Sequence, residues 1–153
     1  MKQIQLTKGK LAIIDDADFE NLSKYSWYFD GKYAARKLPN SRRKIRMHIH
    51  LMNPAAGFEV DHRNRNTLDY RRENLRMASH AENMCNTRHR VSALGVRGVQ
   101  SRGNGFVSKI KVNGKQVYLG YFHTIKAASE AYQKASLQFH GEFSPFFKQG
   151  GSK

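Results

Sequence analysis

The chain has 153 residues, enough for one substantial core or two small ones, which excludes a large enzyme with an elaborate substrate domain. Its formal net charge is +15, and beyond residue 30 the chain carries 23 basic against 7 acidic side chains. Such an excess favours a polyanionic partner that releases condensed counterions on contact. Nucleic acid is the leading partner, and an anionic membrane surface is the second.

Two sequence features narrow the class of protein further. No transmembrane or signal segment is visible, and the longest amphipathic candidate, residues 125–140, has an alanine-rich apolar face, so we expect no membrane partner. The single cysteine, Cys85, excludes an intrachain disulfide framework and a cysteine-rich zinc site. Any metal ion must therefore bind through oxygen or imidazole ligands.

Short apolar runs separated by turn signals predict an N-terminal β-rich segment over residues 1–45. We expect strands around residues 4–6, 11–14, 27–29 and 33–36, and a short helix near residues 18–24. In residues 44–52, apolar side chains alternate with arginine and histidine, which predicts a half-buried strand.

The next predicted module covers residues 46–90. It should contain a strand over Phe58–His62, a polar loop over residues 63–73 and a return strand over residues 74–77. Ser79 and Glu82 have the spacing of a capping box, which predicts a helix from about His80 to His89.

Residues 91–96 lack periodicity and form the predicted linker to a second module over residues 97–147. Three strands are expected at residues 98–100, 106–112 and 117–122, followed by a helix over residues 124–140 that stops at Gly141. Alternation directs Ile110, Val112, Val117 and Leu119 toward this helix. The predicted fold class is α+β.

Asp61, His62 and three asparagines, Asn74, Asn83 and Asn86, are the residues that could perform chemistry. Hydrolysis of a phosphodiester requires an activated water and stabilisation of negative charge. Asp61 and the Asn83 carbonyl would suffice to anchor Mg²⁺, or alternatively Mn²⁺, with His62 as general base. Taken singly, each residue is more typical of a surface turn or a helix cap.

Three segments in order resemble HNH homing endonucleases of phage and intron origin: Val60-Asp61-His62, residues 67–76, and Glu82-Asn83-Met84-Cys85-Asn86. The resemblance implies a ββα-metal nuclease core, also called a His-Me finger. It implies Asp61 and Asn83 as metal ligands and His62 as the residue that activates water. It also implies that Asn74 fixes the histidine and ties the loop between the strands, a staple without catalytic contact being the alternative.

Two further residues receive supporting roles. Asn86 occupies the last position of the motif, one helical turn from Asn83. His48 precedes the core where relatives read Met-His-Arg, and Ile49 stands here in place of that arginine. On the predicted strand His48 and His50 would share a face, but a zinc site there lacks a further ligand, so we expect packing or phosphate contact.

The second module resembles the plant Apetala/ethylene-response-factor DNA-binding domain, through Arg97-Gly98-Val99, Asn113-Gly114-Lys115, residues 119–122 and the helix up to Gly141. The resemblance implies a three-stranded antiparallel sheet that enters the major groove, with one helix packed behind it. The residues expected to bind DNA in this module are Arg97, Gln100, Arg102, Lys109, Lys111, Gln116 and Tyr118. Near the core they are Arg42, Arg43, Arg71 and Arg72.

The sequence thus predicts a metal-dependent DNA endonuclease, a homing or phage nuclease that acts on double-stranded DNA in the cytoplasm of a bacterial host. The alternative is a non-catalytic DNA-binding regulator with a degenerate nuclease domain. One core per chain cuts one strand per binding event, so we expect a monomeric nickase, while a homodimer could cut both strands.

Overall fold

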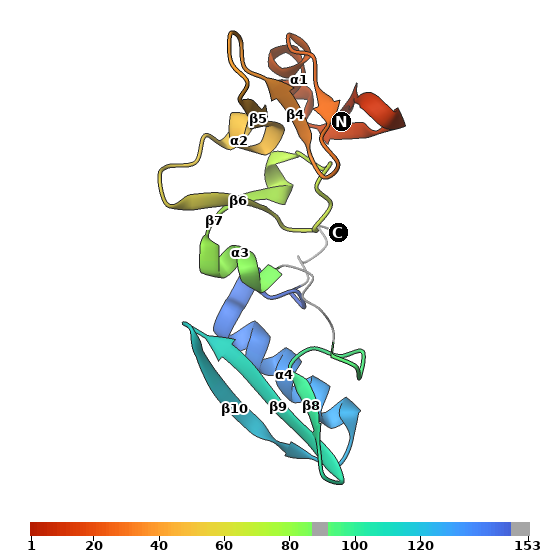
Figure 1. Cartoon of the computed structure of the whole chain (residues 1–153), viewed down its shortest axis with the longest axis vertical. Coiled ribbons are helices and arrows are strands. Elements are labelled where there is room, and N and C mark those ends of the chain that lie inside the picture. The colour runs from red at the N-terminus through yellow and green to blue at the C-terminus, as the bar shows by residue number, and fades with distance from the viewer. Residues whose placement is uncertain (87–91, 148–153) are drawn as a thin grey trace. The chain divides into compact units, whose positions relative to one another are not determined.

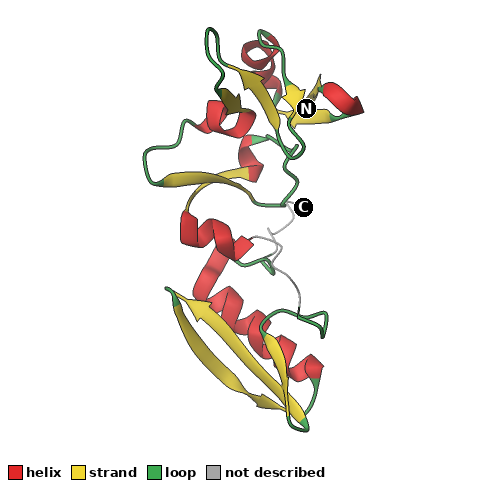
Figure 2. Cartoon of the chain, viewed as in Figure 1, coloured by secondary structure: helices red, strands yellow, loops and turns green. Residues whose placement is uncertain are grey.

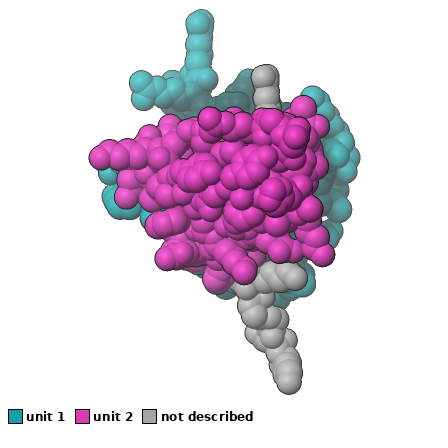
Figure 3. Space-filling view, turned by 90° about the horizontal axis from the view of Figure 1, so that it is seen from below, with its two compact units in different colours: residues 1–83 teal, residues 84–153 magenta. Residues whose placement is uncertain are grey.

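In a computed structural model, residues 1–86 and 92–147 are described, and the chain forms two compact units, residues 1–83 and 84–153 (Figures 1 and 3). Both units combine helices with small antiparallel sheets, so the predicted α+β class is confirmed (Figure 2). Within the described ranges, no helix has the length and apolar character needed to cross a membrane.

Unit 1 contains three small sheets and short helices. Its strands are β1 Lys2–Gln5, β2 Leu11–Ile14, β3 Tyr28–Phe29, β4 Ala34–Lys37, β5 Lys44–Arg46, β6 Phe58–His62 and β7 Leu75–Ser79. Its helices are α1 Asp16–Ser23 and α2 Met47–Met52, with 3-10 turns η1 Thr7–Gly9 and η2 Arg72–Asn74, and α3 His80–Asn86 begins in it. The sheets pair β1 with β2, β4 with both β3 and β5, and β6 with β7, all antiparallel.

The core of unit 1 joins the N-terminal segment to the polar loop after β6. Ile14, Leu22, Met47 and Tyr70 are fully buried in one cluster. Tyr70 lies within the loop, and backbone hydrogen bonds of 2.8 Å join Ile13 to residues 68 and 70. The loop is therefore held against β2, which explains how a tyrosine in a polar stretch becomes a core residue.

The strand predicted over residues 44–52 is wrong beyond Arg46, because α2 takes its place. Met47 and Leu51 are four residues apart, so a helix brings both onto the core. Asn53 ends the helix in the left-handed conformation, with φ of 41°, and Pro54 follows it. The alternating pattern concealed this helix, although Asn53-Pro54 is a typical stop signal.

Unit 2 has the predicted layout of one sheet and one long helix. Its strands are β8 Val99–Arg102, β9 Gly105–Val112 and β10 Lys115–Phe122, in the order β10-β9-β8, followed by α4 Ile125–His140 and the 3-10 turn η3 Gly141–Phe143. The Thr124 side chain accepts a hydrogen bond from Ala127 N, and Gly141 ends the helix with φ of 50°. Helix α4 packs along one face of the sheet (Figure 1).

Gly98 is required where the chain enters β8. Its φ is 66°, and a Cβ placed there would lie 2.1 Å from the Tyr132 ring of α4 and 2.7 Å from the Lys109 carbonyl oxygen. The same glycine accepts a 2.8 Å backbone hydrogen bond from Lys109 N. The entry to β8 can therefore approach both β9 and α4 only without a side chain.

The Tyr70 hydroxyl accepts a 2.6 Å hydrogen bond from the backbone N–H of the fully buried Ala34. We expect Tyr70→Phe to lower the free energy of unfolding by about 1–3 kcal/mol, because that N–H loses its acceptor inside the core. Urea unfolding followed by the fluorescence of Trp27, the single tryptophan, measures unit 1. Tyr28→Phe, at a half-buried ring, is the control and should change stability by less than about 0.5 kcal/mol.

Candidate functional site

The candidate site is built on the β6–β7 hairpin, whose register places Asp61 opposite Arg76 and His62 opposite Leu75. Neighbouring residues of a strand point to opposite faces, so Glu59 and Asp61 share one face of β6 while Val60 and His62 share the other. Asp61 and His62 are both buried. The two residues predicted to act on one phosphate therefore leave the strand in different directions.

Asp61 forms a buried ion pair with Arg76. The Arg76 Nε and Nη2 atoms donate hydrogen bonds of 2.9 and 2.6 Å to Asp61 Oδ2, and both side chains are 7% exposed or less. Two hydrogen bonds to one oxygen fix the carboxylate, and the guanidinium supplies the opposite charge that a buried anion needs. The Asp61 carboxylate is thus held in one orientation on β6.

Helix α3 brings Asn83 to the Asp61 face of β6, because Asn83 Nδ2 donates a hydrogen bond to Glu59 Oε2. His80, one turn earlier, lies 2.8 Å from Glu59 Oε1 through its Nδ1. These hydrogen bonds hold the pKa of Glu59 below its ordinary value. Helix α3 is thereby fastened to β6 through one carboxylate.

The predicted capping box sets where α3 begins. Ser79 N and Oγ donate hydrogen bonds of 2.8 and 2.7 Å to Glu82 Oε2, and Glu82 N donates to Ser79 Oγ at 3.3 Å. These reciprocal bonds satisfy amide groups at the helix start. The described part of the helix ends at Asn86, and the predicted continuation to His89 lies outside the described residues.

His62 belongs to a cluster of aromatic and imidazole rings on the other face of β6. Its ring centroid lies 5.1 Å from that of His48, 5.5 Å from that of Tyr70 and 5.9 Å from that of Tyr33. His48 reaches this cluster from α2, whereas His50 packs on Tyr25 and Trp27. The prediction that His48 and His50 share a strand face is therefore wrong, since both lie on a helix.

Burial governs the protonation of the two clustered histidines. It lowers the pKa of His62 to about 4, although the nearby carboxylates of Asp61 and Asp69 act in the opposite direction. Burial, with the charges of His62 and Arg46, lowers the pKa of His48 to about 3. Both rings are thus neutral at pH 7, the state in which imidazole accepts a proton. His62 is 4% exposed, so its ring reaches a substrate only after a neighbouring side chain moves.

Asn74 ties the loop between β6 and β7 together. Its Nδ2 donates a 2.8 Å hydrogen bond to the Asp69 carbonyl, its Oδ1 accepts a 2.9 Å bond from Asn64 N, and its backbone carbonyl accepts from Arg63 N. These contacts support the predicted loop-tying role. That Asn74 also fixes His62 stays a prediction.

Arg71 and Arg72, predicted to bind DNA, both form two-point ion pairs inside unit 1. Arg71 Nε and Nη2 donate hydrogen bonds of 2.9 and 2.7 Å to Asp69, and Arg72 makes bonds of 2.8 and 2.7 Å to Asp18 of α1. Burial of Asp69 opposes its ionisation, but the bonds from Arg71 and Asn64 outweigh burial and lower the Asp69 pKa. Both arginines therefore clamp the fold, and their contact with DNA stays a prediction.

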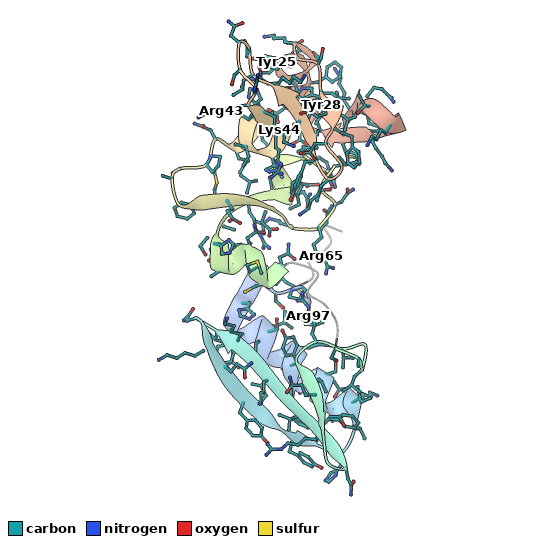
Figure 4. All side chains as sticks on the ribbon, in the orientation of Figure 1. Tyr25, Tyr28, Arg43, Lys44, Arg65 and Arg97 are labelled. Carbon is teal, nitrogen blue, oxygen red and sulfur yellow. The ribbon has the colours of Figure 1, made fainter. Side chains whose placement is uncertain are left out.

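Arg42 and Arg43 lie in the turn between β4 and β5 and are exposed (Figure 4 labels Arg43 and Lys44). Leu38 N donates a 3.0 Å hydrogen bond to the Arg43 carbonyl, and Arg43 N donates to Ser41 Oγ at 3.0 Å. The turn thus has an ordered backbone that presents two guanidinium groups to solvent. They remain candidates for phosphate contact.

In unit 2, the sheet face opposite α4 is polar and cationic. Cross-strand pairing places Lys111 beside Gln116 and Lys109 beside Tyr118, which is 58% exposed. Ile110 and Val117 pair on the other face of the sheet, where Ile110 is buried, as alternation predicts, whereas a β-bulge between Tyr118 and Gly120 interrupts the alternation at Leu119. Gln100 and Arg102 of β8 are also exposed, whereas Arg97 is half-buried and donates to the Cys85 carbonyl at 3.4 Å. We call the sheet face opposite α4 the outer face; it carries Gln100, Arg102, Lys109, Lys111, Gln116 and Tyr118.

Several residues of the site escaped the sequence analysis. The pairing of Arg76 with Asp61 was not predicted, and Glu59 received no role, although it precedes Asp61 by two positions and must share its face of β6. Tyr33 and Tyr70 approach His62 through the tertiary fold, for which the sequence carries no local signal. Asn86, predicted to support the site, is buried and belongs to unit 2.

The donor set of unit 1 fits a divalent cation held by few protein ligands. Asp61 offers a carboxylate oxygen on one face of β6, and Asn83 of α3 adds an amide oxygen at the same face. Magnesium prefers such oxygen ligands and commonly keeps several waters. Over the described part of the chain, no group of three or more His, Cys, Asp or Glu side chains is placed to hold a metal ion.

Comparison with known proteins identifies the central part of the chain. Residues 53–85 match the model of a family described as HNH endonuclease, a range that contains β6, β7, Asp61, His62 and Asn83. The chain therefore contains an HNH endonuclease domain. No curated protein and no solved structure matches the chain. The likeness of residues 97–147 to the Apetala/ethylene-response-factor domain stays a prediction.

The histidine cluster predicts how stability depends on pH. Below pH about 6.5 the unfolded chain binds protons at both rings, whereas the folded rings stay neutral to about pH 4 at His62 and about pH 3 at His48. We therefore expect the free energy of unfolding to fall as pH drops through this window, by at most about 1.4 kcal/mol per pH unit for each histidine.

Urea unfolding at a series of pH values, read from Trp27 fluorescence, checks this expectation. His48→Phe should reduce the slope of the free energy of unfolding against pH by the contribution of one histidine, because only His62 then titrates in the cluster. His123→Ala, at an exposed residue of unit 2, should leave the slope unchanged. An identical slope in the wild type and in His48→Phe would contradict the assignment.

Proposed function

We propose that the protein is a divalent-metal-dependent DNA endonuclease that hydrolyses phosphodiester bonds in unit 1 and binds DNA through both units. The observation that carries the proposal is the position of Asp61, His62 and Asn83 on β6 and α3 inside the HNH domain. The sequential order of two strands and a helix supports a ββα-metal core. A homing or phage nuclease is the specific type we propose.

In this proposal each residue of unit 1 has a distinct task. Asp61 and Asn83 would hold the cation, and Arg76 orients Asp61 through two hydrogen bonds. His62, neutral at pH 7, accepts a proton from the attacking water, and the negative phosphate then favours the imidazolium that forms. Asn74 keeps the loop after His62 in place, and His48 packs against the His62 ring.

A cation held there, Mg²⁺ or alternatively Mn²⁺, would supply stabilisation of the negative charge that develops during hydrolysis. Cleavage leaves a 5′-phosphate and a 3′-hydroxyl. Because one chain carries one such site, we propose that a monomer nicks one strand per binding event.

Unit 2 is proposed to choose and hold the DNA. Its outer face combines lysines, an arginine, two glutamines and an exposed tyrosine on three strands, a composition that suits both phosphate contact and base readout in the major groove. The exposed turn with Arg42 and Arg43 adds positive charge from unit 1.

A second candidate function is a non-catalytic DNA-binding regulator. The observation that favours it is the burial of His62, since a general base must reach its water. A catalytic role requires side-chain movement around this ring when DNA binds, whereas a regulator requires none. Metal-dependent cleavage of plasmid DNA separates the two functions.

We expect the protein to convert supercoiled plasmid into nicked circles in the presence of Mg²⁺, and chelation by EDTA to stop the reaction. His62→Ala should lower the rate by about 10²–10⁴-fold, because the general base is removed. Asp61→Asn and Asn83→Ala should lower it through weaker metal binding. Agarose gel electrophoresis resolves the products.

The matched control is His50→Gln, which changes the other histidine of α2 without touching the His62 cluster. It should cut at nearly the wild-type rate. Full activity of His62→Ala would refute the proposed mechanism. DNA binding without any cleavage under all metal conditions would favour the regulator.

Unit 2 yields a separate expectation about affinity. Replacing both Lys109 and Lys111 with alanine should weaken DNA binding and reduce the slope of log affinity against log salt by about one for each lost phosphate contact. The control variant carries Lys126→Ala and Lys134→Ala on α4, which removes the same charge away from the sheet. Fluorescence anisotropy of a labelled duplex over a salt series measures both slopes, and equal losses would contradict a role specific to the outer face.

A further inference from the structure

The Glu59 carboxylate contacts two residues of α3, His80 and Asn83. Its Oε2 atom accepts the hydrogen bond from Asn83 Nδ2, and its Oε1 atom lies 2.8 Å from His80 Nδ1. The Glu59 side chain is 41% exposed, so it is not a buried group that must form hydrogen bonds to offset its desolvation.

The direction of the Asn83 hydrogen bond decides what the amide can do. A carboxamide presents a donor nitrogen and an acceptor oxygen, and only the oxygen can bind a hard cation. Because Nδ2 donates to Glu59, Oδ1 is the Asn83 atom available as a metal ligand. Rotation of the amide by half a turn would exchange these atoms and present N–H groups to the cation.

Alternation along β6 gives Glu59 the right place for this task. Glu59 and Asp61 are two residues apart and share one strand face, and Asn83 reaches that face from α3. The capping box of Ser79 and Glu82 fixes the start of α3. The position of Asn83 along β6 is therefore set without Glu59.

We propose that Glu59 is a positioning residue that orients the Asn83 carboxamide, so that its oxygen can bind the divalent cation. The inference rests on the proposed function, since it takes Asn83 as a ligand. Glu59 acts through Asn83 and does not itself touch the substrate. Mutation of a residue that orients a metal ligand typically lowers metal affinity by about 10–100-fold.

The test compares Mn²⁺ binding by isothermal titration calorimetry in the full-length protein, without DNA. Glu59→Ala should weaken Mn²⁺ binding by about 10-fold or more, because the amide loses the acceptor that orients it. Glu59→Gln should stay within about threefold of the wild type, because the glutamine carbonyl oxygen can still accept from Asn83 Nδ2. His80→Ala, which removes only the other partner of Glu59, is the matched control and should bind as the wild type does.

A readout without metal accompanies the titration. The side-chain NH₂ resonances of Asn83, identified by their loss in Asn83→Ala, should shift in Glu59→Ala and keep their position in His80→Ala. Circular dichroism and thermal unfolding in EDTA verify that each variant is folded.

Each outcome decides between specific alternatives. Equal weakening by Glu59→Ala and Glu59→Gln would show that the carboxylate itself binds the cation, which overturns the positioning role. Unchanged binding in Glu59→Ala, with weak binding in Asn83→Ala, would overturn the inference and leave the proposed function standing. Unchanged binding in Asn83→Ala would overturn the metal site of the proposed function together with the inference.

Discussion

The alternation of side chains at the end of β6 is the constraint on which the candidate site depends. Asp61 and His62 are adjacent, so the pleat sends them to opposite faces of a two-stranded sheet. Each of these two side chains therefore needs its own neighbouring residues to hold it in place. Arg76 and α3 provide this support for Asp61, and the rings of Tyr33, His48 and Tyr70 provide it for His62. A strand this short can serve both faces only because the loop after it is held against β2.

The secondary structure was largely predictable because it depends on local signals. The capping box at Ser79, the Asn113-Gly114 turn and the stop at Gly141 each specify a boundary through neighbouring residues. The error over residues 47–52 has the same origin, because alternation over a few residues is compatible with both a strand and a short helix. Tertiary burial of Met47 and Leu51 decided between them.

The candidate site was predictable only in part. Asp61, His62 and Asn83 could be identified because their order along the chain resembles a known family. Their partners could not, since the approach of Arg76 to Asp61 depends on hairpin register and the approach of Tyr33 to His62 depends on the packing of the N-terminal segment. The neutral state of His62 follows from that packing as well, because burial is what lowers its pKa.

Ion pairing within unit 1 also determines which positive charges remain for a polyanion. Arg71, Arg72 and Arg76 each place two nitrogen atoms on an aspartate, so much of their charge is neutralised within the fold. Among the described residues, neither the pair Arg42 and Arg43 in the β4–β5 turn nor the pair Lys109 and Lys111 on the outer face forms an ion pair with an acidic side chain. The net charge of +15 is therefore not uniformly available to a partner, and the β4–β5 turn and the outer face are two of the surfaces that present basic side chains. Counterion release from DNA depends on these exposed groups, whereas the paired arginines contribute by keeping Asp61 and the loop in place.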